Sequence, residues 1–310
     1  MIYLFIRYRP VFKYRFSPMH FSLKQLEVFL AVANHENVSV AARELSMSQS
    51  AASTALKELE QRFELQFFDR IGKRLQLNEA GSALRRRAAA LLSEASELEN
   101  SLLTHTEVAE LKVGATLTIG NYLGIGILAD FMAEHPEAQV KLTVENTASI
   151  AHKVRNFELD IGLIEGELQD PDLEIIYWRD DELALFTAPD HPLAGKKSLS
   201  EAELLEANWI VREPGSGTRQ AFDRAMTGIL PNLKLRLELQ HTEGIKRAVE
   251  AGLGIGCLSR LTLEEAFKRK TLVPLAAPQR HWQRKFYFVL HKQKYRGIGV
   301  TSWMSHCRRV

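Results

Sequence analysis

Apolar residues recur at helical spacing through three successive segments between positions 23 and 63. The pattern predicts helices over residues 23–35, about 38–45 and about 49–62. A polar stretch from Ser46 to Ser48 separates the second helix from the third, and Ser48 is a favourable N-cap residue. Two short helices joined by a tight turn are typical of a helix-turn-helix, whose second helix enters the DNA major groove. An ordinary helical hairpin in a core has the same spacing, so the pattern alone leaves both alternatives open.

The predicted helix over residues 49–62 has two faces of different chemistry. We expect Ala52, Leu56, Leu59 and Phe63 to be buried. Small and polar side chains occupy the other face, where glutamine, serine and threonine can hydrogen-bond to base edges. The candidate DNA-binding residues on this face are Gln49, Ser50, Ser53, Thr54 and Lys57.

A short β-hairpin with a basic tip is predicted directly after this helix. Gly72 suits the turn, and the residues from Leu75 to Leu77 alternate as in a strand. Arg70, Lys73 and Arg74 gather at the tip, where cations can contact DNA phosphates and fix the register of a protein on the duplex. A solvated charged turn is the alternative interpretation of these three residues.

A long helix is predicted over residues 79–108, with an apolar stripe along one side. The stripe must be buried, either against its own chain or against a second copy, and its spacing is similar to that of a coiled-coil seam. Its members are Leu84, Ala88, Leu91, Leu92, Ala95, Leu98 and Leu102.

Strands and helices alternate through the second half of the chain, which predicts an α/β architecture with parallel sheets. The expected strands cover residues 112–119, 140–144, 160–164, 183–187, 209–211, 235–240 and 254–258. The expected helices cover residues 121–135, 147–157, 217–227 and 242–251.

Polar residues cluster in the loops that lead from these strands into the helices. In α/β sheets, ligands bind beyond the carboxyl ends of strands, where helix N-termini present amides. A cleft so rich in hydroxyls and amides suits an anion. The candidate effector-binding residues are Thr116, Thr118, Asn121, Asn146, Thr147, Glu165, Ser216, Gly217, Thr218 and Glu243.

Each of these residues has a simpler alternative. Serine and threonine before a helix commonly act only as caps. Glu165 is also placed to bridge two subdomains, and Arg212 and Arg219 are placed to pair with Glu213 as a surface network.

Composition is that of a cytoplasmic globular protein of 310 residues, 25% of them charged, with a formal net charge of +2. A near-neutral DNA-binding protein is expected to cluster its cations, as at the hairpin tip. Cys257 and Cys307 offer neither metal-ligand spacing nor a disulfide framework. The sequence contains no nucleophile elbow, P-loop or HExxH motif, so we expect no catalysis, no metal and no cofactor.

Four segments together resemble the LysR-type transcriptional regulators: LKQLEVFLAVA, AARELSMSQSAAS, LEQRFELQFFDR and LNEAG. The resemblance implies a winged helix-turn-helix, a dimerisation helix and an effector domain of two α/β subdomains like periplasmic solute-binding proteins. It implies a homodimer or homotetramer on an operator of inverted half-sites, contact with RNA polymerase and no membrane association. Ser50 and Thr54 stand where the family commonly has proline and arginine, so the operator sequence does not carry over.

The segments TIGNYLGIGILADF, FELDIGLIEG and REPGSGTR are similar to one branch of the family, the regulators of cysteine and sulfur-oxyanion metabolism. This resemblance implies a small anionic effector, either a sulfite-like oxyanion or a carboxylate. An effector-independent architectural DNA-binding protein is the alternative, and an enzyme on the α/β half is a further one.

The expected domains are a winged helix-turn-helix at residues 19–78, a dimerisation helix at 79–108 and an effector domain at 109–310. Within the effector domain, subdomain I is expected at about 109–181 and 286–310, and subdomain II at about 182–285. Residues 1–18 are aromatic and basic, and because Met19 begins a stretch like an ordinary LysR-type start, we expect them to be a non-native start or a loose tail.

Overall fold

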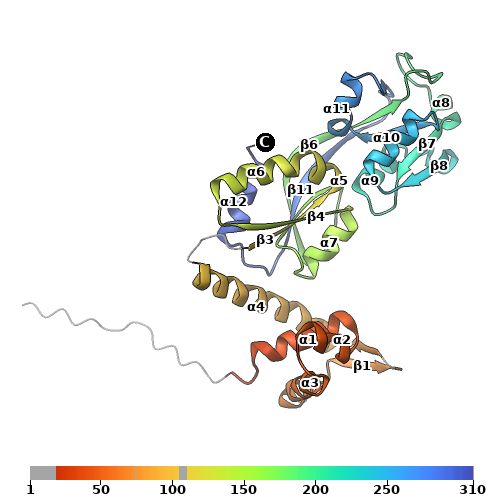
Figure 1. The fold of residues 1–310 in the computed structure, drawn as a ribbon. Coiled ribbons are helices and arrows are strands. Elements are labelled where there is room, and N and C mark those ends of the chain that lie inside the picture. Colours follow the sequence, from red (N-terminus) through yellow and green to blue (C-terminus); the bar gives the residue numbers. More distant parts are fainter. Residues whose placement is uncertain (1–18, 73, 105–109, 310) are drawn as a thin grey trace, which may run out of the picture. The chain divides into compact units, whose positions relative to one another are not determined.

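The computed structural model of this chain describes residues 19–72, 74–104 and 110–309, so the expectation for residues 1–18 falls outside it. The chain divides into two compact units, Met1–Leu92 and Ser93–Val310. Figure 1 shows helices and a small hairpin in the first unit, and a sheet covered by helices in the second.

The first unit contains three helices and a hairpin, followed by the start of a long helix, and side-chain caps fix where the first three helices begin. Ser22 and Gln25 form a capping box, Asn37 accepts from two amides, and Ser48 accepts from the amide of Ala51. The elements are α1 (Leu23–His35), α2 (Val38–Glu44), α3 (Gln49–Phe63), β1 (Phe68–Ile71) and β2 (Arg74–Leu77).

The core of this unit confirms most of the predicted buried face of α3. Ala52, Leu56 and Leu59 are buried, but Phe63 is 42% exposed, so its predicted burial is wrong. Phe63 is the last residue of α3, beyond the part that packs on the core, and its ring lies 6.3 Å from that of Phe21 at the surface.

The antiparallel strands β1 and β2 form the predicted hairpin, and Gly72 takes a positive φ of 63° in its turn. The amide of Leu75 donates to the carbonyl of Glu36 at 3.0 Å, which ties the hairpin to the end of α1. At the base of the hairpin, a Cβ on Gly81 would lie 2.1 Å from the Phe67 carbonyl oxygen, so only glycine fits there.

Helix α4 (Glu79–Thr104) follows, and the rest of the predicted helix, residues 105–108, falls outside the described residues. Its first turns pack on the core of the first unit through Leu84 and Ala88. Leu91 and Leu98 are 39% and 62% exposed. Among the described residues, these two members of the apolar stripe are therefore exposed.

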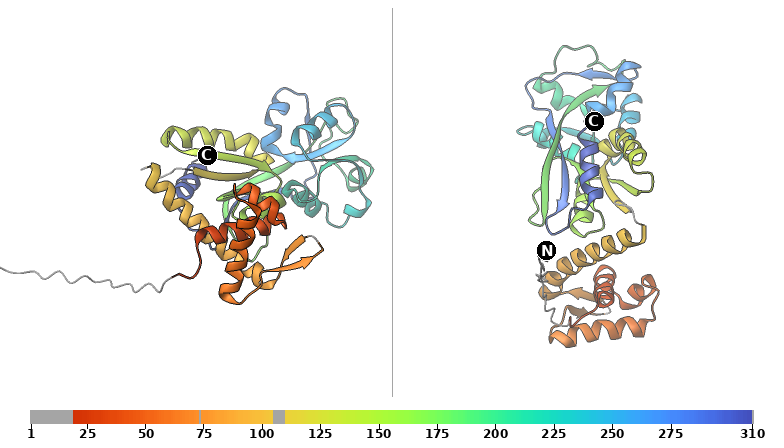
Figure 2. Two further views of the ribbon diagram at one scale, coloured as in Figure 1. Left: turned by 60° about the horizontal axis from the view of Figure 1, so that its bottom comes forward. Right: turned by 90° about the vertical axis from the view of Figure 1, so that its left-hand side faces the viewer.

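The second unit contains one sheet with the strand order β4-β3-β5-β11-β6-β9-β7-β8, and β10 pairs with β6. Buried apolar clusters separate into two groups along this sheet. We call the part around β3, β4 and β5 lobe I and the part around β7, β8 and β9 lobe II. The long strands β6 and β11 run from one lobe into the other (Figures 1 and 2).

Lobe I contains the strands and helices that lie mainly before position 182, together with the end of the chain. Its elements are β3 (Glu110–Thr116), α5 (Leu117–Ile119), the π-helical turn η1 (Gly120–Gly124), α6 (Ile125–Glu134), β4 (Gln139–Glu145), α7 (Thr147–Arg155), β5 (Ile161–Glu165) and α12 (Ile298–Cys307). The shared strands are β6 (Leu173–Thr187) and β11 (Gln283–His291).

Lobe II is formed by the intervening segment of the chain. Its elements are α8 (Glu201–Glu206), β7 (Asn208–Arg212), α9 (Gly217–Ala225), the 3₁₀ turn η2 (Leu230–Asn232), β8 (Lys234–Leu239), α10 (Thr242–Glu250), β9 (Ile255–Ser259), α11 (Arg260–Lys268) and β10 (Val273–Leu275).

The α/β architecture is confirmed, and the predicted parallel pairing is found within each lobe, where β3 pairs with β4 and β5, and β7 pairs with β8 and β9. The sheet as a whole is mixed, however, which was not predicted. Strand β11 runs antiparallel to β5 and β6, and β6 runs antiparallel to β9. The predicted strand over 183–187 is only the end of β6, and β11, β10, α8, α11 and α12 were not predicted. The strand predicted to reach residue 119 ends at Thr116, where the chain turns into α5.

Candidate functional site

The predicted base-reading residues share one exposed face of the first unit. Ser48 accepts a hydrogen bond from the amide of Ala51 and so begins α3 one residue before that face. The face consists of Gln49, Ser50, Ser53, Thr54 and Lys57, all exposed.

The hairpin carries exposed cations next in the sequence to α3. Arg70 and Arg74 are exposed on β1 and β2, and the guanidinium of Arg74 lies 3.8 Å from the carboxylate of Glu36. The predicted role of Lys73 concerns a residue outside the described part. A polar helix face beside exposed arginines has the chemistry of a winged helix-turn-helix, in which cations contact phosphates while the helix contacts bases.

In the second unit, several predicted effector-binding residues meet in one buried hydrogen-bond network around Glu165. The hydroxyls of Thr116, Thr118 and Thr218 donate to the Glu165 carboxylate, the last two at 3.1 and 3.3 Å. The hydroxyl of Thr147 donates to the Glu165 carbonyl at 2.9 Å. Thr218 lies in the first turn of α9 in lobe II and the other four residues belong to lobe I, so this Glu165 network joins the lobes.

A buried arginine that the sequence analysis missed completes the network. Arg284 on β11 is 1% exposed in its side chain, with Nε 2.6 Å from Asp181 and Nη1 3.6 Å from Glu165. Its Nη1 also donates to the hydroxyl of Thr218 at 2.9 Å. The sequence analysis missed Arg284 because it did not predict the strand that carries it.

Close backbone approach brings the loop before α9 against lobe I. The amide of Gly217 donates to the Thr147 hydroxyl at 3.2 Å, and a Cβ on Gly217 would lie 1.9 Å from the Glu165 carbonyl oxygen. Glycine is therefore required at this position. Ser216 acts as the N-cap of α9, accepting from the Thr218 amide at 3.2 Å.

The other predicted effector-binding residues lie outside this network. Asn146 donates from Nδ2 to Glu213 at 3.1 Å, a second contact between the lobes. Asn121 is exposed. The expected surface network of Arg212, Arg219 and Glu213 is wrong in part, because Arg212 is buried with Glu213 while Arg219 bonds to Asp223 and Glu238.

Glu243 takes part in a third contact between the lobes. It accepts from the Tyr122 hydroxyl of lobe I at 2.5 Å and from Lys246 at 2.8 Å. Burial and the neighbouring carboxylate raise the pKa of Tyr122 above its ordinary value. Although burial acts to raise the pKa of Glu243, the hydrogen bonds from Lys246 and Tyr122 lower it below its ordinary value.

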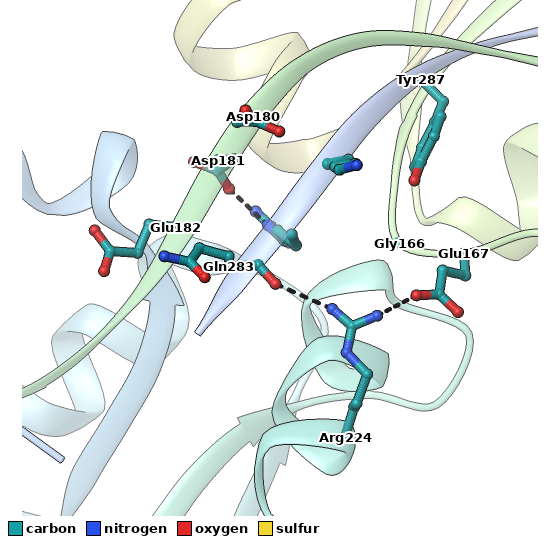
Figure 3. A pocket seen from close by; sticks show the side chains of 10 residues that line it. Gly166, Glu167, Asp180, Asp181, Glu182, Arg224, Gln283 and Tyr287 are labelled. Carbon is teal, nitrogen blue, oxygen red and sulfur yellow. Dashed lines mark hydrogen bonds and ion pairs between the residues drawn. The ribbon is translucent and has the colours of Figure 1, made fainter. Parts of the chain in front are cut away.

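A cavity of about 720 Å³ adjoins the Glu165 network through Arg284 and lies beside the strands that connect the lobes (Figure 3). Its lining mixes carboxylates such as Asp180 and Glu182 with the cations Arg224 and Lys285. It contains none of the predicted effector-binding residues.

Within the residues that the structure describes, no helix is long and apolar enough to cross a membrane, and no cluster of side chains has the composition of a metal site. Cys257 and Cys307 are both free and buried. Burial raises the pKa of the Cys307 thiol to about 12 and also raises that of Cys257.

A recognition helix with a basic hairpin, joined to a two-lobed α/β unit with polar contacts between the lobes, defines a DNA-binding protein with a ligand-binding domain. Residues 23–82 match the family described as "Bacterial regulatory helix-turn-helix protein, lysR family", and residues 105–310 match "LysR substrate binding domain". The chain belongs to the LysR family of transcriptional regulators. This confirms the expectation of a transcriptional regulator and contradicts the alternative of an enzyme on the α/β half.

Similar proteins span nearly the same length. The transcriptional regulator YeiE of Escherichia coli K12 is 38% identical, over 93% of this chain and 98% of its own, and CysL of Bacillus subtilis is 32% identical, over 91% and 96%. The regulatory domain of Synechocystis CcmR, solved in complex with 2-PG, is 28% identical with a TM-score of 0.60, over 65% of this chain and 96% of its own.

Proposed function

We propose that this regulator binds an operator of two inverted half-sites and that a small anion bound between lobes I and II controls its effect on transcription. The anion class that fits is a carboxylate or a sulfite-like oxyanion. The observation that carries the proposal is the Glu165 network, in which three threonine hydroxyls and a buried arginine from both lobes converge on one carboxylate. Loops that bind one carboxylate in this way have the donor chemistry that an anionic effector requires.

In this proposal α3 reads bases and the hairpin holds the DNA backbone. The exposed side chains of Gln49 and Ser53 lie one helical turn apart on α3, so both can reach edges in the same major groove. Arg70 and Arg74 contact phosphates, which supply affinity without sequence information.

Helix α4 is proposed to join two copies of the chain. Leu91 and Leu98 are separated by seven residues and both are exposed, as expected for a seam that a partner helix covers. A two-fold dimer places two recognition helices on inverted half-sites. Pairing of two dimers would give the homotetramer that the resemblance implies.

Effector binding is proposed to change the relation of the lobes and so the packing of subunits. Among the polar contacts between the lobes, those at Glu165, Glu213 and Glu243 are the ones that we propose an effector strengthens or replaces. An effector shifts the balance between two arrangements only by its difference in affinity for them. RNA polymerase is the expected downstream partner at the promoter.

Two measurements on the full chain test the proposal. Operator selection from a random DNA library, followed by fluorescence anisotropy, should yield a motif with dyad symmetry. Titration of the protein–operator complex with sulfite, sulfate, acetate and glycolate should then change affinity or DNA bending for at least one anion. A motif without symmetry, or a complex insensitive to every anion, contradicts the corresponding half of the proposal.

A further inference from the structure

Arg212 has a buried donor that no group in the described part of the chain accepts. Arg212 is the last residue of β7, and its side chain is 1% exposed. Its Nε and Nη2 donate to the carboxylate of Glu213 at 2.8 and 3.0 Å. Its Nη1 is buried and has no hydrogen-bond partner among the described residues. A buried guanidinium nitrogen without an acceptor is uncommon in folded proteins and calls for a specific explanation.

A second buried donor lies at the same edge and on the same face of the sheet. Residues alternate between faces along β7, so Arg212 shares the face of Ile210, which packs in one cluster with Ile245 of α10. Arg212 pairs with Leu239, the last residue of β8, and α10 begins three residues later at Thr242. The Thr242 hydroxyl is buried and also lacks a hydrogen-bond partner in the described part of the chain.

The helix that begins at Thr242 adds backbone donors to this position. Its N-cap residue His241 makes no side-chain hydrogen bond to the first turn of α10. An uncapped helix N-terminus presents amides and a partial positive charge, both of which favour an anion. Arg212 Nη1 and the Thr242 hydroxyl therefore both lack an acceptor among the described residues, and Thr242 opens a helix whose first turn has no side-chain cap.

We infer that Arg212, Thr242 and the N-terminus of α10 form an anion subsite of lobe II, separate from the Glu165 network. The inference rests on the proposed function and names where the effector's charged group binds. In the Glu165 network the threonine hydroxyls already donate to a protein carboxylate, whereas the donors of this subsite remain available.

The charges around the subsite select an oxyanion with one negative charge, such as a carboxylate. Glu213 neutralises Arg212 and Lys246 neutralises Glu243, so the neighbouring side chains supply no net positive charge to balance a second negative charge on the ligand. Lobe I contacts both of these glutamates, through Asn146 to Glu213 and through Tyr122 to Glu243. An anion bound between them is placed to influence the contacts that hold the lobes together.

The test compares four variants of the full chain by isothermal titration calorimetry with acetate, glycolate, nitrate and sulfate. Thr242→Val removes only the hydroxyl, and Thr242→Ser restores it. Thr262→Val is the matched control, because Thr262 is equally buried at 2% in the first turn of α11 but its hydroxyl already donates to the Ser259 carbonyl. Thermal unfolding of each variant shows that it is folded.

For the monovalent anion that binds the wild-type protein best, we expect Thr242→Val to weaken Kd by about tenfold or more. Thr242→Ser and Thr262→Val should remain within about twofold of the wild type, and sulfate should bind more weakly than the monovalent anion. A double variant, Arg212→Gln with Glu213→Gln, should lose binding without leaving an unpaired buried charge.

Three results overturn the inference. If an anion binds but Thr242→Val leaves its Kd unchanged, the subsite is wrong while the proposed function stands. If sulfate binds more tightly than every monovalent anion, the charge argument fails. If none of the four anions binds the wild-type protein, the anionic effector itself is contradicted, and the subsite fails with it.

Discussion

Replacing Arg284 by methionine should destabilise the second unit strongly, because it leaves two buried carboxylates without their cation. Arg284 is 1% exposed and contacts Asp181 at 2.6 Å and Glu165 at 3.6 Å. Removal of one partner from a buried ion pair costs about 3–5 kcal/mol, most of it from the charge left behind. Asp181 keeps the Ser259 hydroxyl at 2.8 Å and Glu165 keeps its threonine donors, so we expect about 3 kcal/mol.

Urea unfolding followed by tryptophan fluorescence measures this loss of stability in the second unit, because all four tryptophans of the chain lie after position 177. Arg296→Met is the matched control. Arg296 pairs with Glu174, but both side chains are about 40% exposed, and exposed pairs contribute only about 0–1 kcal/mol.

The reasoning is refuted if Arg284→Met and Arg296→Met lower the free energy of unfolding by similar small amounts. A second check is the double variant Arg284→Met with Asp181→Asn. It should recover part of the loss, because the more closely paired of the two carboxylates is then neutral.

Four further predictions concern DNA binding, assembly and thiol chemistry. Gln49→Ala should cost about 1–3 kcal/mol of operator binding but leave random-DNA binding unchanged, measured by anisotropy; equal losses on both DNAs would remove the base-reading role. Arg70→Ala should weaken binding to both DNAs and lower the salt slope by about one, and an operator-only loss would argue against a phosphate contact. Leu91→Glu should shift light-scattering mass towards the monomer, and an unchanged mass would place the subunit interface elsewhere. Because burial raises the pKa of Cys257, its thiol should resist Ellman's reagent at pH 8 until urea is added, and rapid reaction of the folded protein would contradict its burial.

Local sequence signals predicted the first unit well because its boundaries depend on neighbouring residues. Ser22, Asn37 and Ser48 each cap the helix that follows them, and Gly72 supplies the positive φ of the hairpin turn. Phe63 was the exception, because helical periodicity places a residue on a face but does not say where the core ends along the helix.

The strands that connect the lobes escaped prediction because their apolar pattern is interrupted by charge. Four consecutive residues of β6, from Arg179 to Glu182, are charged, and β11 contains Arg284 and Lys285. The interruption has a structural cause, since the register of β6 and β11 pairs Asp181 with Arg284 and Asp180 with Lys285. Charges that compensate one another across two strands cannot be recognised from either strand alone.

The two buried arginines differ in a way that bears on control by a ligand. Arg284 uses its donors on acceptors of the protein, so it stabilises the present relation of the lobes. Arg212 engages Glu213 with two nitrogens and leaves the third buried without an acceptor in the described chain. Glu213 also accepts a hydrogen bond from Asn146 of lobe I. An anion that binds Arg212 therefore affects Glu213, a carboxylate that residues of both lobes contact. In the proposed subsite, anion binding and contact between the lobes meet at one carboxylate, so each is expected to affect the other.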